Sequence, residues 1–466
     1  MNPSSSTIIA LCTAQGPGAL AIIRLSGNEA RRIANKRAIF LSKNKNLLSV
    51  PSHTIHFGSI RDKNGSLIDQ VLFLVMDAPH SFTGENTIEI SCHNNPFIIQ
   101  SILEAYLLEG AQLAENGAFT RRALENGKLD LLQAEAINEL IHAQTQQALS
   151  CSLAQLTGTL SYWLKELEKK FLTALCFTET NFEFIEEEGH EFGETIRTLV
   201  DTAHQDILTI KKNISAQTVI RNGVRVALIG SVNAGKSSLF NALIGSGRAI
   251  VTNIPGTTRD VIEGTIYTKQ TFITFCDTAG IRNTNNCIEQ EGITRSYQEA
   301  HKADCILCVV DKSRQLTNEE AVFYRTLLSN YSEKIIIIFN KTDIEVSCPN
   351  FKDLFAQYRQ ECPLIAVSCK TGANIQIVQK NIEKKIEKMF TSFSSPFLLN
   401  KRQQGLLLQL EHATDTLKSM LQQKKIPYEL VSCHIQELLC FITELSGHTI
   451  SEQTMDTIFK SFCVGK

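Results

Sequence analysis

The sequence has no long hydrophobic run and no strong excess of one charge. Its most apolar stretch, "KIIIIFN", is far too short to cross a bilayer, so we expect no membrane association. The first residues, "MNPSSSTIIALCTAQGPGAL", show no basic region followed by a long apolar core, which speaks against a signal peptide and for a cytoplasmic protein. A formal net charge of −2 over 466 residues excludes a global basic field, so any contact with RNA requires a local patch.

The sequence also has no cysteine framework. Its 14 cysteines are scattered without the spacing of a disulfide-rich domain, which favours reduced, partly buried thiols in a cytosolic protein. The one C-x-x-C, from Cys305 to Cys308, lies in the apolar run "DCILCVVD". In a strand, residues three apart point to opposite faces, so we expect no shared metal ion there. His93 could be a metal ligand, but no second ligand cluster supports that interpretation.

The remaining composition, 43% hydrophobic and 20% charged, is that of a globular protein with about two to four domains. Over residues 1–127, strand-like runs alternate with helical ones and predict an α/β domain. Over 128–221, apolar residues recur every three or four positions without proline, which predicts long helix. Alternating strands and helices predict a parallel sheet over 222–388, and 389–466 is helical again. This order indicates an α/β domain inserted into one discontinuous helical domain.

The strongest motif is "GSVNAGKSS", Gly230–Ser238, which matches G-x-x-x-x-G-K-[ST] between an apolar strand and a helix. Its glycines let backbone N–H groups face phosphate oxygens. We expect Lys236 to hold the β- and γ-phosphates and the Ser237 hydroxyl to bind Mg²⁺.

Three further motifs identify the nucleotide as GTP. In "DTAG", Asp277 can hold magnesium through its water shell and the Gly280 N–H can meet the γ-phosphate. In "NKTD", the carboxylate of Asp343 can accept both guanine N1–H and the exocyclic amine, and adenine offers no such donor pair. "SCKTG", from Ser368, would close over the base. The order and spacing of the four motifs resemble the GTPase branch of the P-loop fold.

The segment "TNIPGTTRD" provides the switch region, in which Thr258 is the natural second magnesium ligand. Ras-like enzymes place a glutamine after D-x-x-G to orient water, but Ile281 stands there and cannot do so. Asn233 offers an oxygen beside the phosphates that suits a monovalent cation in the place of an arginine finger; alternatively, it only caps its own turn.

The residues that we expect to bind GTP are Asn233, Ala234, Gly235, Lys236, Ser237, Ser238, Thr252, Asn253, Ile254, Pro255, Gly256, Thr257, Thr258, Asp277, Thr278, Ala279, Gly280, Asn340, Lys341, Asp343, Ser368, Cys369 and Lys370.

With these motifs, the chain resembles the MnmE (TrmE) family of tRNA-modification GTPases. The likeness runs from residue 7 to the last residue and includes "IALCTAQGPGALAIIRLSG", "SFTGENTIEISCHNNP", "FTRRALENGKLDLLQAEAINELI" and the terminal "FCVGK". It implies a multidomain α/β plus all-α fold: an N-terminal α/β folate-binding and dimerisation domain, a discontinuous helical domain, and an inserted Ras-like P-loop GTPase domain.

The resemblance implies tRNA chemistry. Family members act with the flavoprotein MnmG to add an aminomethyl or carboxymethylaminomethyl group at C5 of the wobble uridine of tRNA. A tetrahydrofolate derivative, such as 5-formyl-tetrahydrofolate, supplies the one-carbon unit and lies at the interface of a homodimer. The matching folate positions here are Arg24, Glu89, Lys128 and Lys466. A carboxylate for the pterin and cations for the glutamate tail suit this role, although each residue alone could be a solvated surface charge.

The family also implies how hydrolysis proceeds without the glutamine. Potassium fills the arginine-finger position when G domains pair, and its ligands here would be Asn233, Thr252, Ile254 (through its carbonyl) and Thr257. A glutamate downstream of D-x-x-G orients the attacking water. Counting along the chain gives Glu289 this catalytic role beside Lys236, with Glu291 as the competing position.

The terminal "FCVGK" has the form of a C-a-a-X prenylation signal on Cys463, but the family carries this ending without prenylation. We therefore expect Cys463 and Lys466 to lie close to the folate. The chain departs from the family pattern at Val232, which replaces a proline of the phosphate loop and should loosen it slightly. It also departs at Cys369, where alanine is usual, and at "NNPF" after His93, where a glycine-rich turn is usual.

Two other functions fit parts of the sequence. A ribosome-assembly GTPase would bind RNA without altering it, but it would not need the folate residues or Cys463. A folate-binding structural protein with a vestigial G domain conflicts with the intact Lys236, Ser237, Thr258 and Asp277.

Overall fold

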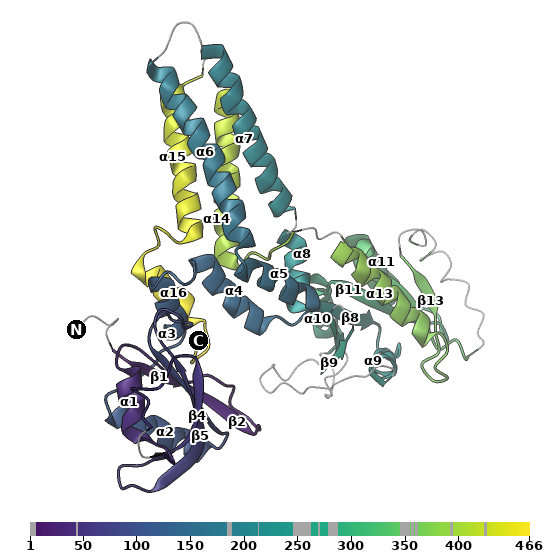
Figure 1. The fold of residues 1–466 in the computed structure, drawn as a ribbon. Coiled ribbons are helices and arrows are strands. Elements are labelled where there is room, and N and C mark those ends of the chain that lie inside the picture. Colours follow the sequence, from purple (N-terminus) through teal and green to yellow (C-terminus); the bar gives the residue numbers. More distant parts are fainter. Residues whose placement is uncertain are drawn as a thin grey trace. The chain divides into compact units, whose positions relative to one another are not determined.

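The computed structural model describes residues 6–42, 45–183, 189–212, 214–245, 262–268, 271–277, 288–344, 355, 358, 362–391, 395–423 and 426–466. The chain divides into two compact units (Figure 1). The first comprises Met1–Ile141, Leu153–Gln205 and Gly405–Lys466, and the second comprises His142–Ser152 and Asp206–Gln404. The domain boundaries expected at 127/128, 221/222 and 388/389 stay predictions.

The first unit contains a seven-stranded sheet in the order β3-β4-β5-β6-β2-β1-β7. All neighbours are antiparallel except β1 and β7, which are parallel. The strands are β1 (Ile8–Leu11), β2 (Leu20–Ser26), β3 (Ala38–Ile39), β4 (Thr54–Arg61), β5 (Leu67–Met76), β6 (Thr87–His93) and β7 (Gln112–Leu113). The four longest, β2, β4, β5 and β6, coincide with the strand-like runs of the sequence and confirm the expected α/β fold.

Helices α1 (Ala30–Arg37) and α2 (Pro96–Leu108) pack on one face of this sheet. Their apolar side chains join those of alternate strand positions, such as Phe73 and Ile90, in one core. The start of α2 follows from local chemistry: the Asn95 side chain accepts the N–H of Phe97, and proline stands at the first helical position.

The remaining helices of this unit come from both sides of the inserted domain. They are α3 (Ala118–Glu125), α4 (Leu131–His142), α5 (Gln146–Leu156), α6 (Thr159–Glu183), α7 (Gly189–Lys211), α14 (Lys401–Leu421), α15 (Tyr428–Ser446) and α16 (Glu452–Lys460). Residue 142 of α4, residues 146–152 of α5, 206–211 of α7 and 401–404 of α14 belong to the second unit. Helix α6 packs on α15, and Arg197 of α7 donates to the carbonyl of Leu421 at the end of α14. The expected packing of the two flanking helical stretches is confirmed (Figure 1).

The long helix expected after residue 128 is instead three helices, α4, α5 and α6. The first break ends at Thr145, whose hydroxyl accepts the N–H of Ala148 and donates to the Ile220 carbonyl. The second is at Gly158, which has a φ of +91° that an α-helix cannot contain. The absence of proline was therefore insufficient to predict a continuous helix.

The second unit contains a six-stranded sheet in the order β13-β12-β11-β8-β10-β9. It is parallel except for β9, which runs antiparallel to β10. The elements are β8 (Val224–Gly230), β9 (Ile262–Tyr267), β10 (Phe272–Asp277), β11 (Cys305–Asp311), β12 (Ile335–Asn340), β13 (Leu364–Ala366), α8 (Ile214–Asn222), α9 (Lys236–Gly245), α10 (Ile288–Lys302), α11 (Asn318–Tyr331), η2 (Ser332–Lys334) and α13 (Ile375–Thr391).

Strand β11 confirms the interpretation of "CILC". Cys305 lies in the core cluster that includes residues of α9 and α13, whereas Cys308 lies in the cluster with α10 and α11 on the opposite face. Every cysteine in the described segments is a free thiol, and these segments contain no metal-binding cluster of histidine, cysteine or acidic residues. No helix in the described part of the chain is long and apolar enough to span a membrane.

Candidate GTP site

The phosphate loop joins the end of β8 to the start of α9, as the motif predicts. Asn233 and Gly235 both adopt left-handed backbone conformations, with φ of +59° and +92°. A Cβ on Gly230 would lie 2.1 Å from the Val309 carbonyl oxygen, and one on Gly235 would lie 2.1 Å from Nδ2 of Asn340. Only glycine fits these two positions, because neighbouring strands approach the loop so closely.

Lys236 is almost fully buried at the first position of α9. Its Nζ donates to the carbonyl oxygens of Gly230 (2.8 Å) and Ser231 (2.9 Å), at the other end of the loop. Burial lowers the pKa of Lys236, and the charge of Asp277 acts against this shift. The loop therefore holds an ammonium group in place by its own backbone, which prepares it to meet a phosphate.

Ser237 and Asp277 lie together at the neighbouring end of β10. The Ser237 hydroxyl donates to Oδ2 of Asp277 at 2.6 Å, and Asp277 is 1% exposed. Hydroxyl and carboxylate oxygens are the ligands that Mg²⁺ prefers, so this pair fits the metal that the motif predicts.

The guanine motifs meet at the ends of β12 and β13. Asn340 donates from Nδ2 to the Ala234 carbonyl at 3.0 Å, and its Oδ1 accepts the N–H of Cys369 at 3.2 Å. It therefore connects the phosphate loop to the "SCKTG" segment. The Ser368 hydroxyl donates to Oδ1 of Asp343 at 2.7 Å.

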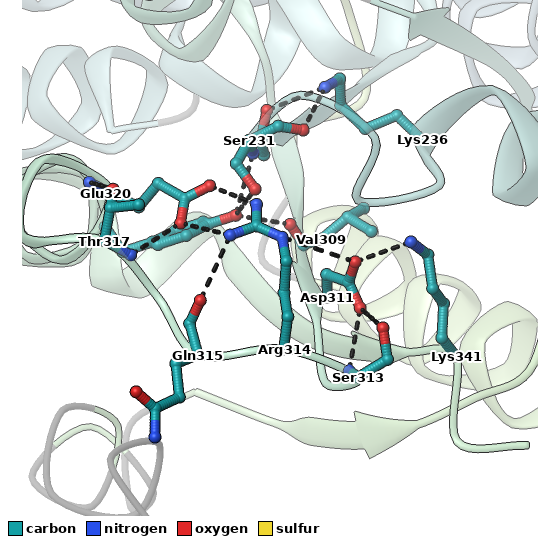
Figure 2. A network of polar contacts seen from close by, with 12 residues as sticks. Ser231, Lys236, Val309, Asp311, Ser313, Arg314, Gln315, Thr317, Glu320 and Lys341 are labelled. Carbon is teal, nitrogen blue, oxygen red and sulfur yellow. Dashed lines mark hydrogen bonds and ion pairs between the residues drawn. The ribbon is translucent and has the colours of Figure 1, made fainter. Parts of the chain in front are cut away.

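The carboxylate of Asp343 is exposed and held in its ionised form. The hydrogen bond from Ser368 is the main cause that lowers its pKa, and Lys370 and Lys341 add favourable charge. Lys341 is itself fixed by a 2.6 Å bond from Nζ to Oδ2 of Asp311 at the end of β11 (Figure 2). An ionised, oriented carboxylate is what recognition of two guanine donors requires.

In the first unit, Arg24 and Glu89 face each other on β2 and β6. Arg24 donates from Nε (2.8 Å) and Nη2 (2.7 Å) to Oε1 of Glu89, and among the described residues Oε2 accepts no hydrogen bond. The guanidinium carbon lies 5.3 Å from the ring centroids of both Phe82 and Phe119. These contacts orient the pair and leave one carboxylate oxygen available to a ligand.

The terminal segment lies beside this pair. The Phe119 N–H donates to the Lys466 carbonyl, and the charges of Arg24, Glu89 and Lys466 all act on the thiol of Cys12, whose pKa is raised by burial. Three of the four expected folate residues therefore lie near enough to Cys12 for their charges to act on its thiol. The fourth, Lys128, donates from Nζ to the Pro79 carbonyl at 3.1 Å.

Two family descriptions match the chain: "GTP-binding protein TrmE N-terminus" over residues 7–128 and "MnmE helical domain" over residues 131–463. The chain belongs to the MnmE family. Its relatives of that family include proteins named "tRNA modification GTPase MnmE" from three organisms. That of Geobacillus thermodenitrificans is 38% identical, with 99% of both chains covered; that of Chlorobium phaeovibrioides is 34% identical, with 99% and 98% covered; that of Aquifex aeolicus is 35% identical, with 98% and 99% covered.

Several residues that we expect to bind GTP, magnesium or potassium lie outside the described residues. These are the switch residues Thr252, Asn253, Ile254, Pro255, Gly256, Thr257 and Thr258, and also Thr278, Ala279 and Gly280. Glu289 belongs to α10, but its side chain and that of Glu291 also lie outside the described residues. Of the potassium ligands, only Asn233 is described, and its role stays a prediction.

The MnmE ending "FCVGK" is packed, not free. Phe462 joins Phe459 and Ala134 in a small core, and the Cys463 carbonyl accepts the N–H of Gly117. A Cβ on Gly465 would lie 2.3 Å from the Leu11 carbonyl oxygen, which explains the glycine.

The motifs did not point to Cys12, Phe82, Phe119 or Tyr324, and they gave Ser231, an unspecified position of the phosphate loop, no role. Each acts through a contact with a residue far away in the sequence, so spacing along the chain carried no signal for it. Only the aromatic residues within the family segments "SFTGEN" and "FTRRAL" could have indicated Phe82 and Phe119.

Proposed function

We propose that this MnmE-family GTPase hydrolyses GTP with potassium stimulation and, together with MnmG, adds an aminomethyl or carboxymethylaminomethyl group to C5 of the wobble uridine of certain tRNAs. A tetrahydrofolate derivative supplies the one-carbon unit, and the protein works in the cytoplasm as a homodimer. The observation that carries this proposal is the presence, in one chain of this family, of an ordered phosphate loop and a separate Arg24–Glu89 ion pair.

For GTP hydrolysis, the protein must hold the phosphates and stabilise the charge that develops on them. Lys236 already faces the loop carbonyls and can transfer its donors to phosphate oxygens without leaving its place. Ser237 and Thr258 would hold Mg²⁺, which neutralises phosphate charge when bound. Glu289 would orient the attacking water.

Potassium would occupy the position of an arginine finger and add positive charge there. Its ligands would be Asn233, Thr252, Ile254 and Thr257. The left-handed backbone of Asn233, with a side chain unpaired among the described residues, supports this role. GTP hydrolysis measured in KCl and NaCl at equal ionic strength tests it: equal rates would contradict the potassium part of the proposal.

For folate binding, the pterin would use the Oε2 oxygen of Glu89, whose carboxylate Arg24 holds in a fixed position through Oε1. Lys128 and Lys466 would supply positive charge to the glutamate tail. The aromatic rings of Phe82 and Phe119, each with its centroid 5.3 Å from the guanidinium carbon, help to hold the guanidinium in place.

The sheet offers a face for a second copy of the chain. In the cross-strand register, Glu89 and Arg24 form one row with Ile55 and Leu74, and Phe57 pairs with Leu72 in the next row. This is the face opposite to α1 and α2, and Ile55, Phe57 and Leu72 are at least 40% exposed on it. A dimer that covers these apolar side chains would also cover the Arg24–Glu89 pair, which lies in the same row.

The decisive experiment is nucleoside mass spectrometry on tRNA from cells that lack this protein, rescued with wild type or Lys236→Ala. We expect wild type to restore C5-modified wobble uridines and Lys236→Ala to fail. Lys380→Ala, an exposed lysine on α13, is the matched control and should rescue.

Two results would contradict the proposal. If Lys236→Ala also restores the modification, GTP hydrolysis is dispensable for the chemistry. If wild type does not restore it, the assembly-factor function becomes the better interpretation.

A further inference from the structure

The beginning of the phosphate loop is hydrogen-bonded to helix α11 through one buried hydroxyl. The backbone N–H of Ser231 donates to Oη of Tyr324 at 2.9 Å, and this hydroxyl donates to the Val309 carbonyl at 2.9 Å. Tyr324 is 0% exposed. The side chain thus joins strand β11, helix α11 and the phosphate loop through a single oxygen atom.

The side chain of Ser231 is held by the same helix. Its hydroxyl lies 3.2 Å from Oη of Tyr324 and also makes a hydrogen bond with the Glu320 carboxylate. Glu320 is fixed in turn by Arg314 and by a capping box with Thr317 at the start of α11 (Figure 2). Because both the backbone and the side chain of Ser231 are held, the peptide groups on either side of it have little freedom.

Those peptide groups are the ones that bind Lys236. Its ammonium donates to the carbonyls of Gly230 and Ser231, which flank the amide that Tyr324 holds. Figure 2 shows Lys236 beside Ser231. A rotation of the Ser231 peptide would move one acceptor of Lys236 and the amide partner of Tyr324 together. The orientation of the lysine therefore depends on a hydroxyl outside all four GTP motifs.

We propose that Tyr324 is a positioning residue for GTP hydrolysis: through the Ser231 peptide it sets the phosphate loop and the direction of the Lys236 ammonium, with Glu320 as its support. This inference rests on GTP hydrolysis at the phosphate loop, and it does not depend on tRNA modification, folate or potassium.

The change Tyr324→Phe isolates the hydroxyl. The ring contact with Phe355 and the packing against β11 remain, so the core keeps its volume. What is lost is the acceptor for Ser231 N–H and the donor to Val309. Tyr331→Phe is the matched control, because Tyr331 lies on the same helix and borders the same core, and its hydroxyl has no hydrogen bond among the described residues.

The measurement compares kcat and KM for GTP, and Kd for GDP and IDP, in the purified full chain. For Tyr324→Phe we expect a Kd for GDP about tenfold higher and a kcat at least threefold lower. The ratio of Kd for IDP to Kd for GDP should stay within twofold of wild type, because the guanine contacts of Asp343 are untouched. A general loosening of the domain would weaken GDP binding and would also lower the ratio of Kd for IDP to Kd for GDP.

Tyr331→Phe should match wild type in all these constants. The inference is overturned if Tyr324→Phe binds GDP within twofold of wild type, or if it loses guanine discrimination to the same extent as affinity. If Tyr324→Phe does not fold, Glu320→Gln is measured in its place: a rise of threefold or more in KM for GTP supports the inference, and an unchanged KM overturns it. Absence of GTP hydrolysis in wild type would instead contradict the proposed function.

Discussion

At the scale of single residues, the site depends on positions where the backbone leaves no room for a side chain. Gly235 has a φ of +92°, and a Cβ at this position would lie only 2.1 Å from Nδ2 of Asn340. Asn340 cannot move away freely, because it holds both the Ala234 carbonyl and the Cys369 N–H. A side chain at Gly235 would therefore disturb, through Asn340, both the phosphate loop and the segment expected to close over the guanine.

We predict that Gly235→Ala weakens the binding of GDP by more than tenfold, measured by titration calorimetry. The left-handed conformation alone costs an alanine about 1–2 kcal/mol, and the contact with Asn340 adds to that. Gly245→Ala, at the end of α9 with no atom within 4 Å of its Cβ, is the control and should bind as wild type does. An affinity of Gly235→Ala within twofold of wild type would show that the loop accommodates a Cβ.

The residues of the GTP motifs are the part of the site that the sequence could predict. Lys236, Ser237, Asp277, Asn340 and Asp343 stand in short motifs directly after strands, and the structure brings them to one edge of the sheet as parallel strands require. Tyr324 was beyond prediction, because its partner Ser231 lies 93 positions away and no pattern joins the two.

At the scale of elements, the helical bundle depends on contact between chain segments that the inserted domain separates. Helix α6 packs on α15, and each buries an apolar stripe: Leu164, Leu167 and Phe171 on α6, and Ile435, Leu438 and Ile442 on α15. The three- and four-residue spacing of these side chains predicted the helices and their buried faces. It could not predict where Gly158 would interrupt them, because glycine is tolerated inside some helices.

We predict that Leu438→Ala destabilises the bundle by about 2–5 kcal/mol, since it removes a fully buried side chain and leaves a cavity. The KM for GTP should not change, because the phosphate loop belongs to the other unit. Thermal unfolding followed by circular dichroism measures the first effect. Leu430→Ala, on the same helix but 54% exposed, is the control and should have the same unfolding temperature as wild type. Equal melting of the two variants would contradict the packing described here.

At the scale of the whole molecule, the strand-like runs predicted an α/β domain, but they did not show which apolar residues of the sheet would stay exposed; along β4 and β5 buried and exposed side chains alternate. The paired residues His56 and Phe73 are buried, whereas the next pair along β4 and β5, Phe57 and Leu72, is exposed. This open apolar face shares its rows with Arg24 and Glu89. A homodimer formed there would explain why these exposed side chains are apolar.

The open face leads to a prediction about assembly. Phe57→Glu places a charge in the middle of the proposed interface, where burial of an unpaired carboxylate is strongly unfavourable. We expect the dimer dissociation constant to rise at least 100-fold, about 2.8 kcal/mol, so that sedimentation velocity detects a monomer. Phe97→Glu is the matched control: Phe97 is 80% exposed on α2, against the opposite face of the same sheet, and this variant should remain a dimer. A dimeric Phe57→Glu, or equal dissociation of both variants, would exclude this face as the interface.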